Sequence, residues 1–297
     1  MLRRGSLVIF SLLLLCTALA GIARGGDVVV APSLPETVRT WHLGEAGQTF
    51  RSTQAEFLKA AGADSRLGFN ISSLGTAMVF VPPGRFVMGD DSGEEDEQPE
   101  TPVRISRGFW LGKYEVTQDE WREVMRLSPS HYKGPTRPVE FVTWKAAEEF
   151  CQRLTERERS AGRLPRGYVY RLPTEAEWEY TCRLGIDSHS PAVTSDTGWF
   201  AVNAKETTHP VGQKQPDALG LHDMFGNVSE WCLDWFGKYS GHDVTDPVGP
   251  FTGDFRVARG GCSFDIAYGC RPSYRTGAEP IVRSAGIGMR VALAPEL

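Results

Sequence analysis

Cysteines are the residues of this chain with the widest chemical repertoire. A thiol can form a disulfide, ligate a soft metal ion such as copper(I), or act as a thiolate nucleophile. Because five of them follow residue 150, and five is odd, at least one must be free, bound to a metal or paired between chains. A buried, inert thiol is the commonest alternative, and spacing alone does not decide between these states. The five are Cys151, Cys182, Cys232, Cys262 and Cys270.

Histidines offer little support for a metal centre of another kind. None of the six is followed by a second histidine at His-x-x-x-His spacing, which is a frequent arrangement in zinc sites. Each one alone is more often a hydrogen-bonded or surface residue than a ligand. They are His42, His131, His189, His209, His222 and His242.

The first residues have the layout of a secretory signal peptide. Two arginines precede an apolar run over residues 7–20, and small residues at Ala18 and Ala20 suit cleavage after Ala20. We therefore interpret residues 1–25 as a signal peptide and expect a secreted or periplasmic protein. The apolar run is too short for a comfortable membrane span, so no stable span is expected after cleavage. Export also permits disulfides.

Composition excludes one class of partner. The chain has 297 residues, of which 41% are hydrophobic, so it can bury a sizeable core. Its 32 basic and 37 acidic residues give a net charge of -5 without long basic blocks. Nucleic acid is therefore not expected as a partner, since phosphate backbones bind concentrated positive charge.

Two parts follow the signal peptide. Residues 26–77 contain few structural signals and are interpreted as an N-terminal extension or linker, whereas residues 78–297 form the main domain. At its start, two strand-like runs at 78–81 and 85–88 flank a Pro-Pro-Gly turn, which predicts a hairpin. The acidic stretch 90–100 lacks regular ligand spacing and is interpreted as a solvated loop.

Three helices are predicted in this domain. Thr117 with Glu120 and Thr174 with Glu177 have the spacing of capping boxes, and a third helix is indicated after Thr143. Their tryptophans are expected in the core, and Gly185 is expected to end the last helix in a left-handed conformation. Beyond Gly185 the chain is rich in Gly, Pro and Asp, with only brief strands expected, and the best candidates are at 256–259 and 288–293.

Several motifs in one order resemble the formylglycine-generating, or sulfatase-modifying factor, family. The resemblance covers more than two thirds of the chain, and its specificity comes from the combination, since Arg-Gly-Gly alone would mean little. The matching stretches are Phe86-Val-Met-Gly89, Tyr114-Glu-Val-Thr117, Pro138-Val139 with Trp144, Arg171-Leu-Pro-Thr-Glu-Ala-Glu-Trp-Glu-Tyr180, Gly220-Leu-His-Asp-Met-Phe-Gly-Asn227, Glu230-Trp231, Arg259-Gly-Gly261 and Gly286-Ile-Gly-Met-Arg290.

The resemblance implies an α+β domain of the sulfatase-modifying factor fold, which is C-type lectin-like and loop-rich, with few regular elements. The best-known branch oxidises a cysteine in a Cys-x-Pro-x-Arg segment of a sulfatase to formylglycine. It uses oxygen and a copper(I) ion held by two cysteines. A protein or peptide substrate such as a sulfatase is accordingly the partner that the resemblance implies.

Cys262 and Cys270 are the candidate catalytic residues, and Cu+ would be their cofactor. Copper(I) is a soft ion, so two converging thiolates suit it. In the oxidase branch the two cysteines lie five residues apart, but here Asp265 stands five residues before Cys270, and Cys262 stands eight before it. The broader group of paralogues implies instead a Cys182 to Cys270 disulfide with Cys262 as a small buried residue.

The resemblance also implies a Ca2+ site in the loop after His222. Carried over position by position, its ligands are Asp223, Gly226, Val228 and Glu230. Carboxylates and main-chain carbonyls are the hard oxygen ligands that calcium prefers. The alternative is that Asp223 only forms a turn and Glu230 is a surface charge.

Three functions remain open. The domain could oxidise a protein or peptide group, or it could be a non-catalytic C-type lectin-like binding module for a peptide, glycan or protein. A tailoring enzyme with other catalytic residues is the third. Free thiols near Arg259 would favour oxidation, and a disulfide there would favour binding.

Overall fold

The computed structural model describes residues 68–71, 73–186 and 193–297. The predicted signal peptide and most of the predicted extension lie outside these residues. The described part combines short strands with few helices and long loops, so the predicted loop-rich α+β class is confirmed.

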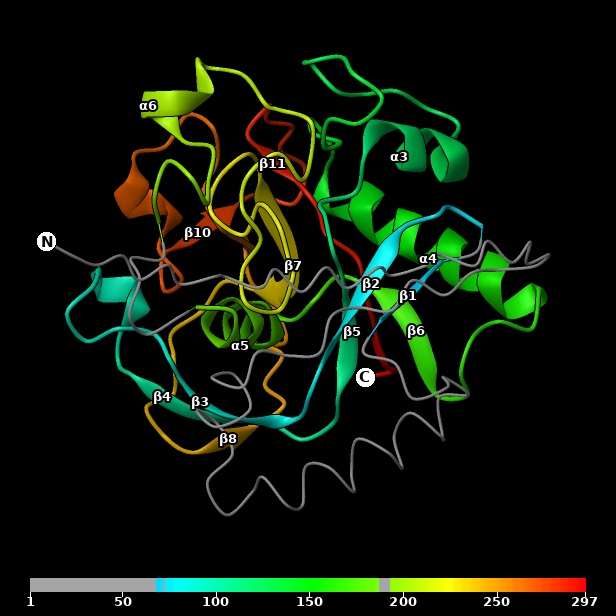
Figure 1. Ribbon diagram of the computed structural model, residues 1–297. Helices are drawn as coiled ribbons and strands as arrows, with labels where there is room; N and C mark the ends of the chain where they lie inside the picture. The colour runs from blue at the N-terminus through cyan, green and yellow to red at the C-terminus, as the bar shows by residue number, and fades with distance from the viewer. Residues whose placement is uncertain (1–67, 72, 187–192) are drawn as a thin grey trace, which may run out of the picture.

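One sheet has five strands, and its pairings are all antiparallel (Figure 1). The strand nearest the end of the chain lies inside this sheet, between two strands that come much earlier. Main-chain hydrogen bonds therefore join residues far apart in sequence. The spatial order is β1 (Gly68–Asn70), β2 (Ala77–Val81), β5 (Phe109–Gly112), β12 (Ala292–Pro295) and β6 (Tyr168–Arg171).

The other named strands of the described residues form two smaller sheets. The first has the order β10 (Arg275–Ala278), β9 (Arg256–Arg259), β7 (Ser229–Trp235) and β11 (Ile287–Gly288). The second has the order β3 (Gly84–Met88), β4 (Thr101–Ile105) and β8 (Val244–Thr245). The predicted strand at 256–259 is confirmed, whereas the one at 288–293 is divided between β11 and β12.

The predicted hairpin at the start of the domain is wrong. β2 pairs with β1 and β5, while β3 pairs with β4 in a different sheet. Both edges of β2 are thus occupied, and the Pro-Pro-Gly segment leads the chain from one sheet to another. A short turn between two strands allowed a hairpin but could not exclude other pairing partners.

The three predicted helices are present as α3 (Gln118–Met125), α4 (Trp144–Ser160) and α5 (Glu175–Leu184), and α6 (Ala201–Ala204) is short. Both capping boxes form. The expected left-handed Gly185 is wrong, because its φ is -79°. Glycine is needed there for close packing, since a Cβ would lie 2.1 Å from a carboxylate oxygen of Asp217.

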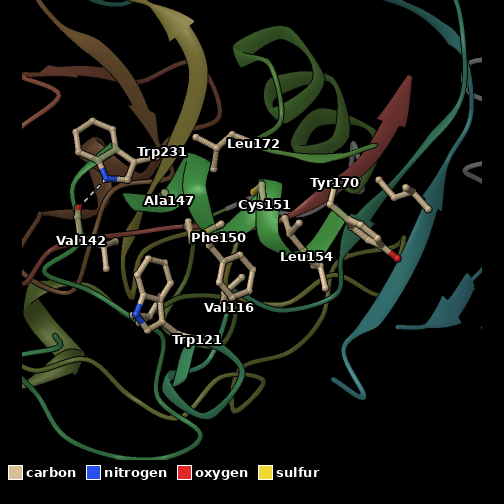
Figure 2. Packing of buried hydrophobic residues seen from close by; sticks show 14 of the residues in the cluster. Val116, Trp121, Val142, Ala147, Phe150, Cys151, Leu154, Tyr170, Leu172 and Trp231 are labelled. Carbon is tan, nitrogen blue, oxygen red and sulfur yellow. Dashed lines mark hydrogen bonds between the residues drawn. The ribbon is translucent and has the colours of Figure 1, made fainter. Parts of the chain in front are cut away.

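The tryptophans of the three predicted helices belong to the core, as expected. Trp121 of α3 stacks on Phe150 of α4, with ring centroids 5.3 Å apart and an interplanar angle of 4°. The indole N–H of Trp231 donates to the carbonyl of Val142 at 3.1 Å (Figure 2). The buried indole of Trp231 thus contributes apolar area while its polar atom stays paired.

Helix α5 lies in the middle of the fold, against β3, β4, β7 and β9 (Figure 1). Nearly all its residues are buried, including three glutamates. A buried carboxylate is costly without a partner, and Glu179 pairs with the fully buried Arg259 at the end of β9. Its carboxylate also accepts from the backbone N–H of Gly89 at 2.9 Å and from Arg183 at 2.7 Å.

The other two glutamates of α5 are paired in the same way. Glu175 forms a two-point contact with Arg275 of β10 at 2.6 and 2.7 Å. Glu177 binds Arg171 of β6 at two distances of 2.7 Å and also completes the capping box of the helix. Through these pairs α5 fixes strands of two sheets around one helix.

Replacing Arg259 by methionine tests this network. Arg259→Met leaves the buried Glu179 with only the partly exposed Arg183 as a cationic partner, so we expect the free energy of unfolding to fall by about 3 to 5 kcal/mol. Urea denaturation would measure it. The control is Arg153→Met, which removes an exposed pair with Glu149 and should cost under about 1 kcal/mol. Equal effects of the two substitutions would contradict the assigned role of Arg259.

Candidate functional site

The loop that holds both candidate cysteines begins where β9 ends. Gly260 and Gly261 follow Arg259 with φ values of +92° and +66°, a conformation that glycine adopts without strain. A Cβ on Gly261 would lie 2.6 Å from the carbonyl oxygen of Gly269 and 2.7 Å from the sulfur of Cys270. The two glycines therefore let the start of the loop pack against its end.

Asp265 forms two hydrogen bonds with the backbone of Cys262 in the same loop. Its carboxylate accepts a hydrogen bond from the backbone N–H of Cys262 at 2.8 Å, and its own N–H donates to the carbonyl of Cys262 at 3.0 Å. Asp265 stands five residues before Cys270, where the oxidase branch has its first cysteine. At this place the chain has a backbone-bound carboxylate in the loop instead of a thiol.

Both candidate thiols point into the protein. All five described cysteines are free, so the Cys182 to Cys270 disulfide implied by the resemblance is not formed. Cys262 is 8% exposed and Cys270 is fully buried. Burial raises the pKa of both thiols, to about 12 for Cys262, with the charge of Asp265 adding to the effect. Each thiol is therefore protonated at neutral pH.

These residues do not fit the copper centre of the oxidase branch. A copper(I) ion would need two thiols that it can reach, whereas both thiols of this loop are buried. At the matching spacing it offers a carboxylate, which is a hard ligand.

Apolar side chains occupy the outer face of the same loop. Phe264, Ile266 and Tyr268 are 40%, 66% and 45% exposed. The ring of Tyr132 lies beside Phe264, with centroids 6.2 Å apart. We call Phe264, Ile266 and Tyr268 the apolar loop face. They stand at alternate positions of one loop, and exposed apolar patches are typical of binding surfaces.

The acidic stretch 90–100 is attached to the end of this loop. Glu97 is fully buried and forms a two-point contact with Arg271 at 2.6 and 3.1 Å. The expectation of a wholly solvated acidic loop is therefore wrong at Glu97. Its partner is distant in sequence, which is why charge patterning did not find it.

The predicted calcium loop lies beside the cysteine loop. The backbone N–H of Gly226 donates to the carbonyl of Gly260 at 2.8 Å, and that of Ser263 donates to the carbonyl of Asn227 at 3.0 Å. Gly226 has a φ of +99°, and a Cβ there would lie 1.9 Å from the carbonyl oxygen of Trp199. This loop conformation therefore requires glycine.

The two predicted side-chain ligands have different surroundings. One carboxylate oxygen of Asp223 accepts from the backbone N–H of Gly212 at 2.7 Å, and the other is buried without a hydrogen-bond partner. Such an orphaned oxygen is suited to binding a cation. Glu230 is instead paired with Arg290 at 2.7 Å and accepts from the indole of Trp178 at 2.8 Å.

A third buried carboxylate, Glu115, completes this cluster. It accepts from the side-chain amide of Asn227 at 2.6 Å and from the backbone N–H of Val228 at 3.0 Å. Sequence reasoning gave no role to Glu115 or to Arg290, although both lie in the matching motifs. Those motifs were the signal that could have found them.

The cluster has more negative than positive charge. Asp223, Glu115 and Glu230 are buried around one guanidinium, that of Arg290. Burial raises the pKa of Asp223 to about 6, and burial followed by the charge of Asp223 raises that of Glu115 well above its usual range. A divalent cation would neutralise this excess, so the donor set fits calcium in charge and in its unsatisfied oxygen.

Within the described residues, no three His, Cys, Asp or Glu side chains converge as a metal-holding group. The predicted calcium set has only two such side chains, because its other ligands are carbonyls. That finding therefore leaves the calcium prediction untested.

The fold is that of one family, whose matching region includes both loops. The sulfatase-modifying factor enzyme 1-like domain matches residues 70–295, and the chain belongs to this family. The formylglycine-generating enzyme of Streptomyces coelicolor is 30% identical over 86% of this chain and 78% of its own. Chaperone protein LppX of Paenibacillus barcinonensis is 34% identical over 43% of this chain. The matched part of the chain spans only 62% of the length of LppX.

A solved structure supports the same conclusion. Treponema denticola variable protein 1 superposes with a TM-score of 0.69 at 28% identity, over 77% of this chain and 98% of that one. The predicted sulfatase-modifying factor fold, with its C-type lectin-like character, is confirmed.

Thiol reactivity tests the burial of the cysteine loop. At pH 8 a thiol of pKa about 12 is thiolate in roughly one molecule of ten thousand, so native Cys262 should react slowly with Ellman's reagent. Its rate should rise roughly tenfold per pH unit from 8 to 11, because the pKa is raised. Cys262→Ser identifies its contribution. One rapid equivalent at pH 8 that this variant lacks would contradict the structure.

Proposed function

We propose that this chain is an exported member of the family that binds a protein or peptide segment and does not generate formylglycine. The observation that carries the proposal is the loop 262–270. Its thiols are buried, Asp265 replaces the first cysteine of the oxidase pair, and apolar side chains lie on its outer face.

The apolar loop face is the proposed contact surface. It occupies the segment between the two candidate cysteines, where the oxidase branch presents its reactive groups to a peptide. The family description names sulfatases as the modified partner, and one relative is named a chaperone protein. A polypeptide segment is therefore the occupant that best suits this face.

Export is part of the proposal and is supported by the signal-peptide pattern of residues 1–25. A secreted or periplasmic location follows from it. Where the structure describes the chain, no helix has the length and apolar character needed to cross a membrane.

Cysteine oxidation is the second candidate function. It is favoured by the free state of Cys262 and Cys270 and by the identity with a formylglycine-generating enzyme. Free thiols are necessary for that chemistry, but burial and a raised pKa oppose thiolate formation. Binding without oxidation is accordingly the stronger proposal.

An oxidation assay separates the two functions. The protein is treated with copper(I) and given a Cys-x-Pro-x-Arg peptide in air, and mass spectrometry follows the peptide cysteine. We expect no formylglycine, whereas the Streptomyces coelicolor enzyme serves as the positive control. Formylglycine that is lost in Cys270→Ser would establish oxidase activity and overturn the proposal.

A binding assay tests the apolar loop face. The probe is a fluorescent Ser-x-Pro-x-Arg peptide, whose serine prevents oxidation. Ile266→Glu places a charge on the contact surface and should weaken binding at least tenfold by anisotropy. Leu127→Glu is the matched control, because Leu127 is similarly exposed elsewhere. No binding by the unmodified protein, or equal loss in both variants, would refute the proposed surface.

A calcium ion is proposed for the neighbouring loop. Asp223 would supply its orphaned oxygen, Gly226 and Val228 would supply carbonyls, and Glu230 would share its carboxylate with Arg290. The bound ion would supply positive charge that the three buried carboxylates lack. It would thereby hold the loop that supports Gly260 and Ser263.

Thermal melting tests this site without any activity assay. Calcium in excess should raise the melting temperature of the native protein, and at 100 times the Kd the gain is about 2.7 kcal/mol. Asp223→Asn should abolish the shift, while Asp119→Asn, at an exposed pair with Arg122, should retain it. A native protein whose melting temperature is the same in calcium and in chelator would refute the site.

A further inference from the structure

A cavity of about 520 Å³ lies at the end of β7 that is remote from the cysteine and calcium loops. β7 leaves the calcium loop at Ser229 and reaches the cavity wall at Asp234 and Trp235. The four steps along the strand from Glu230 to Asp234 span about 13 Å. The cavity is therefore separate from the site described above, and its volume is typical of small-ligand sites.

Asp234 lines this cavity and is only 3% exposed. One of its carboxylate oxygens accepts a hydrogen bond from the backbone N–H of Glu175, the first residue of α5, at 2.8 Å. Among the described residues, no donor reaches its other oxygen, Oδ1. Oδ1 is not one of the fully buried side-chain atoms that lack a partner, so this free acceptor is open to the cavity.

Other charged groups of the wall are already paired or in solvent. Glu175 and Arg275 form their two-point contact, and Arg275 also donates to the carbonyl of Gly237 at 2.7 Å. Lys238 is exposed, so water screens its charge. The carboxyl group of Asp234 is therefore the one buried ionisable group of the described cavity wall that forms no ion pair.

The aromatic rings of the wall have cationic partners as well. The guanidinium of Arg256 lies 3.6 Å from the ring centre of Trp235. That of Arg275 lies 4.2 Å from the ring centre of Tyr239. Neither ring needs a cation from a ligand, which leaves the free oxygen of Asp234 as the acidic feature of the wall that a ligand cation would meet. The deeper wall, with Met88, Val103 and Val244, is apolar.

We propose that this cavity binds a primary ammonium group on an apolar stem, with the ammonium donating to Oδ1 of Asp234. A single free oxygen suits a compact ammonium ion, whereas a guanidinium is best bound by two oxygens. The apolar wall would contact the stem. A free alkylamine and a lysine side chain share this chemistry.

The electrostatics of Asp234 agree with this geometry. Burial and then the charge of Glu175 raise the pKa of Asp234 to about 8. A bound ammonium ion would favour the carboxylate form by direct attraction. The cavity would thus provide a negative partner only when a cation enters it.

Ligand-observed NMR titration tests the proposal on the full chain. The cationic probes are hexylamine and the blocked peptide Gly-Lys-Gly, and their neutral counterparts are hexanol and Gly-norleucine-Gly. We expect at least one cationic probe to bind at least tenfold more tightly than its counterpart. Whether the amine or the peptide binds identifies the source of the ammonium group.

Two variants assign the binding to this cavity. Asp234→Asn keeps an oxygen for the N–H of Glu175 but removes the charge, and it should weaken cationic binding at least tenfold. Val248→Trp fills the rim of the cavity and should weaken it too, without changing Asp234. Asp243→Asn is the control, because Asp243 lies in an exposed pair with Arg85.

Three results would overturn the proposal. They are no binding of either cationic probe, equal binding of charged and neutral probes, and unchanged binding by Asp234→Asn. The apolar loop face lies at the other end of β7, so the Ser-x-Pro-x-Arg assay is independent of these variants. Failure of one proposal would leave the other standing.

Discussion

The buried ion pair between Arg259 and Glu179 is the interaction on which the rest of the structure depends. The guanidinium of Arg259 binds helix α5 through Glu179, and it also donates to the carbonyls of Pro272, Ser273 and Tyr274 at 2.7 to 2.9 Å. One side chain thus holds a helix, the end of a strand and the segment that follows Cys270. Because the charge is fully buried, it is stable only while these partners stay in place.

Hydrogen bonds join the cysteine loop to the cluster of buried carboxylates formed by Asp223, Glu115 and Glu230. Asn227 connects them, since its carbonyl accepts from Ser263 while its amide donates to Glu115. Trp178 of α5 reaches the same cluster through Glu230. The conformation of the cysteine loop therefore depends on its hydrogen bonds to the calcium loop and the buried carboxylates. This explains how the loop keeps a fixed form although its thiols are neither cross-linked nor ionised.

Local signals in the sequence predicted the helices well, because a capping box satisfies backbone groups only three residues apart. Strand pairing is not local, and so Met78 and Phe86, which fall in adjacent runs, belong to different sheets. The buried pairs of Glu97 and Glu115 were missed for the same reason. Family motifs predicted where the site lies, but the direction in which Asp265 and Cys262 point depends on hydrogen bonds that only the fold provides.

The interior position of β12 in the five-stranded sheet affects how the chain folds during its synthesis. Residues 292–295 separate β5 from β6, so an emerging polypeptide cannot close this sheet until almost the whole domain has been synthesised. Before that moment β5 and β6 each present an unpaired edge, which invites association with other chains. A domain built in this way folds late and depends on distant contacts. Its synthesis therefore includes a vulnerable interval that a fold with sequentially paired strands would avoid.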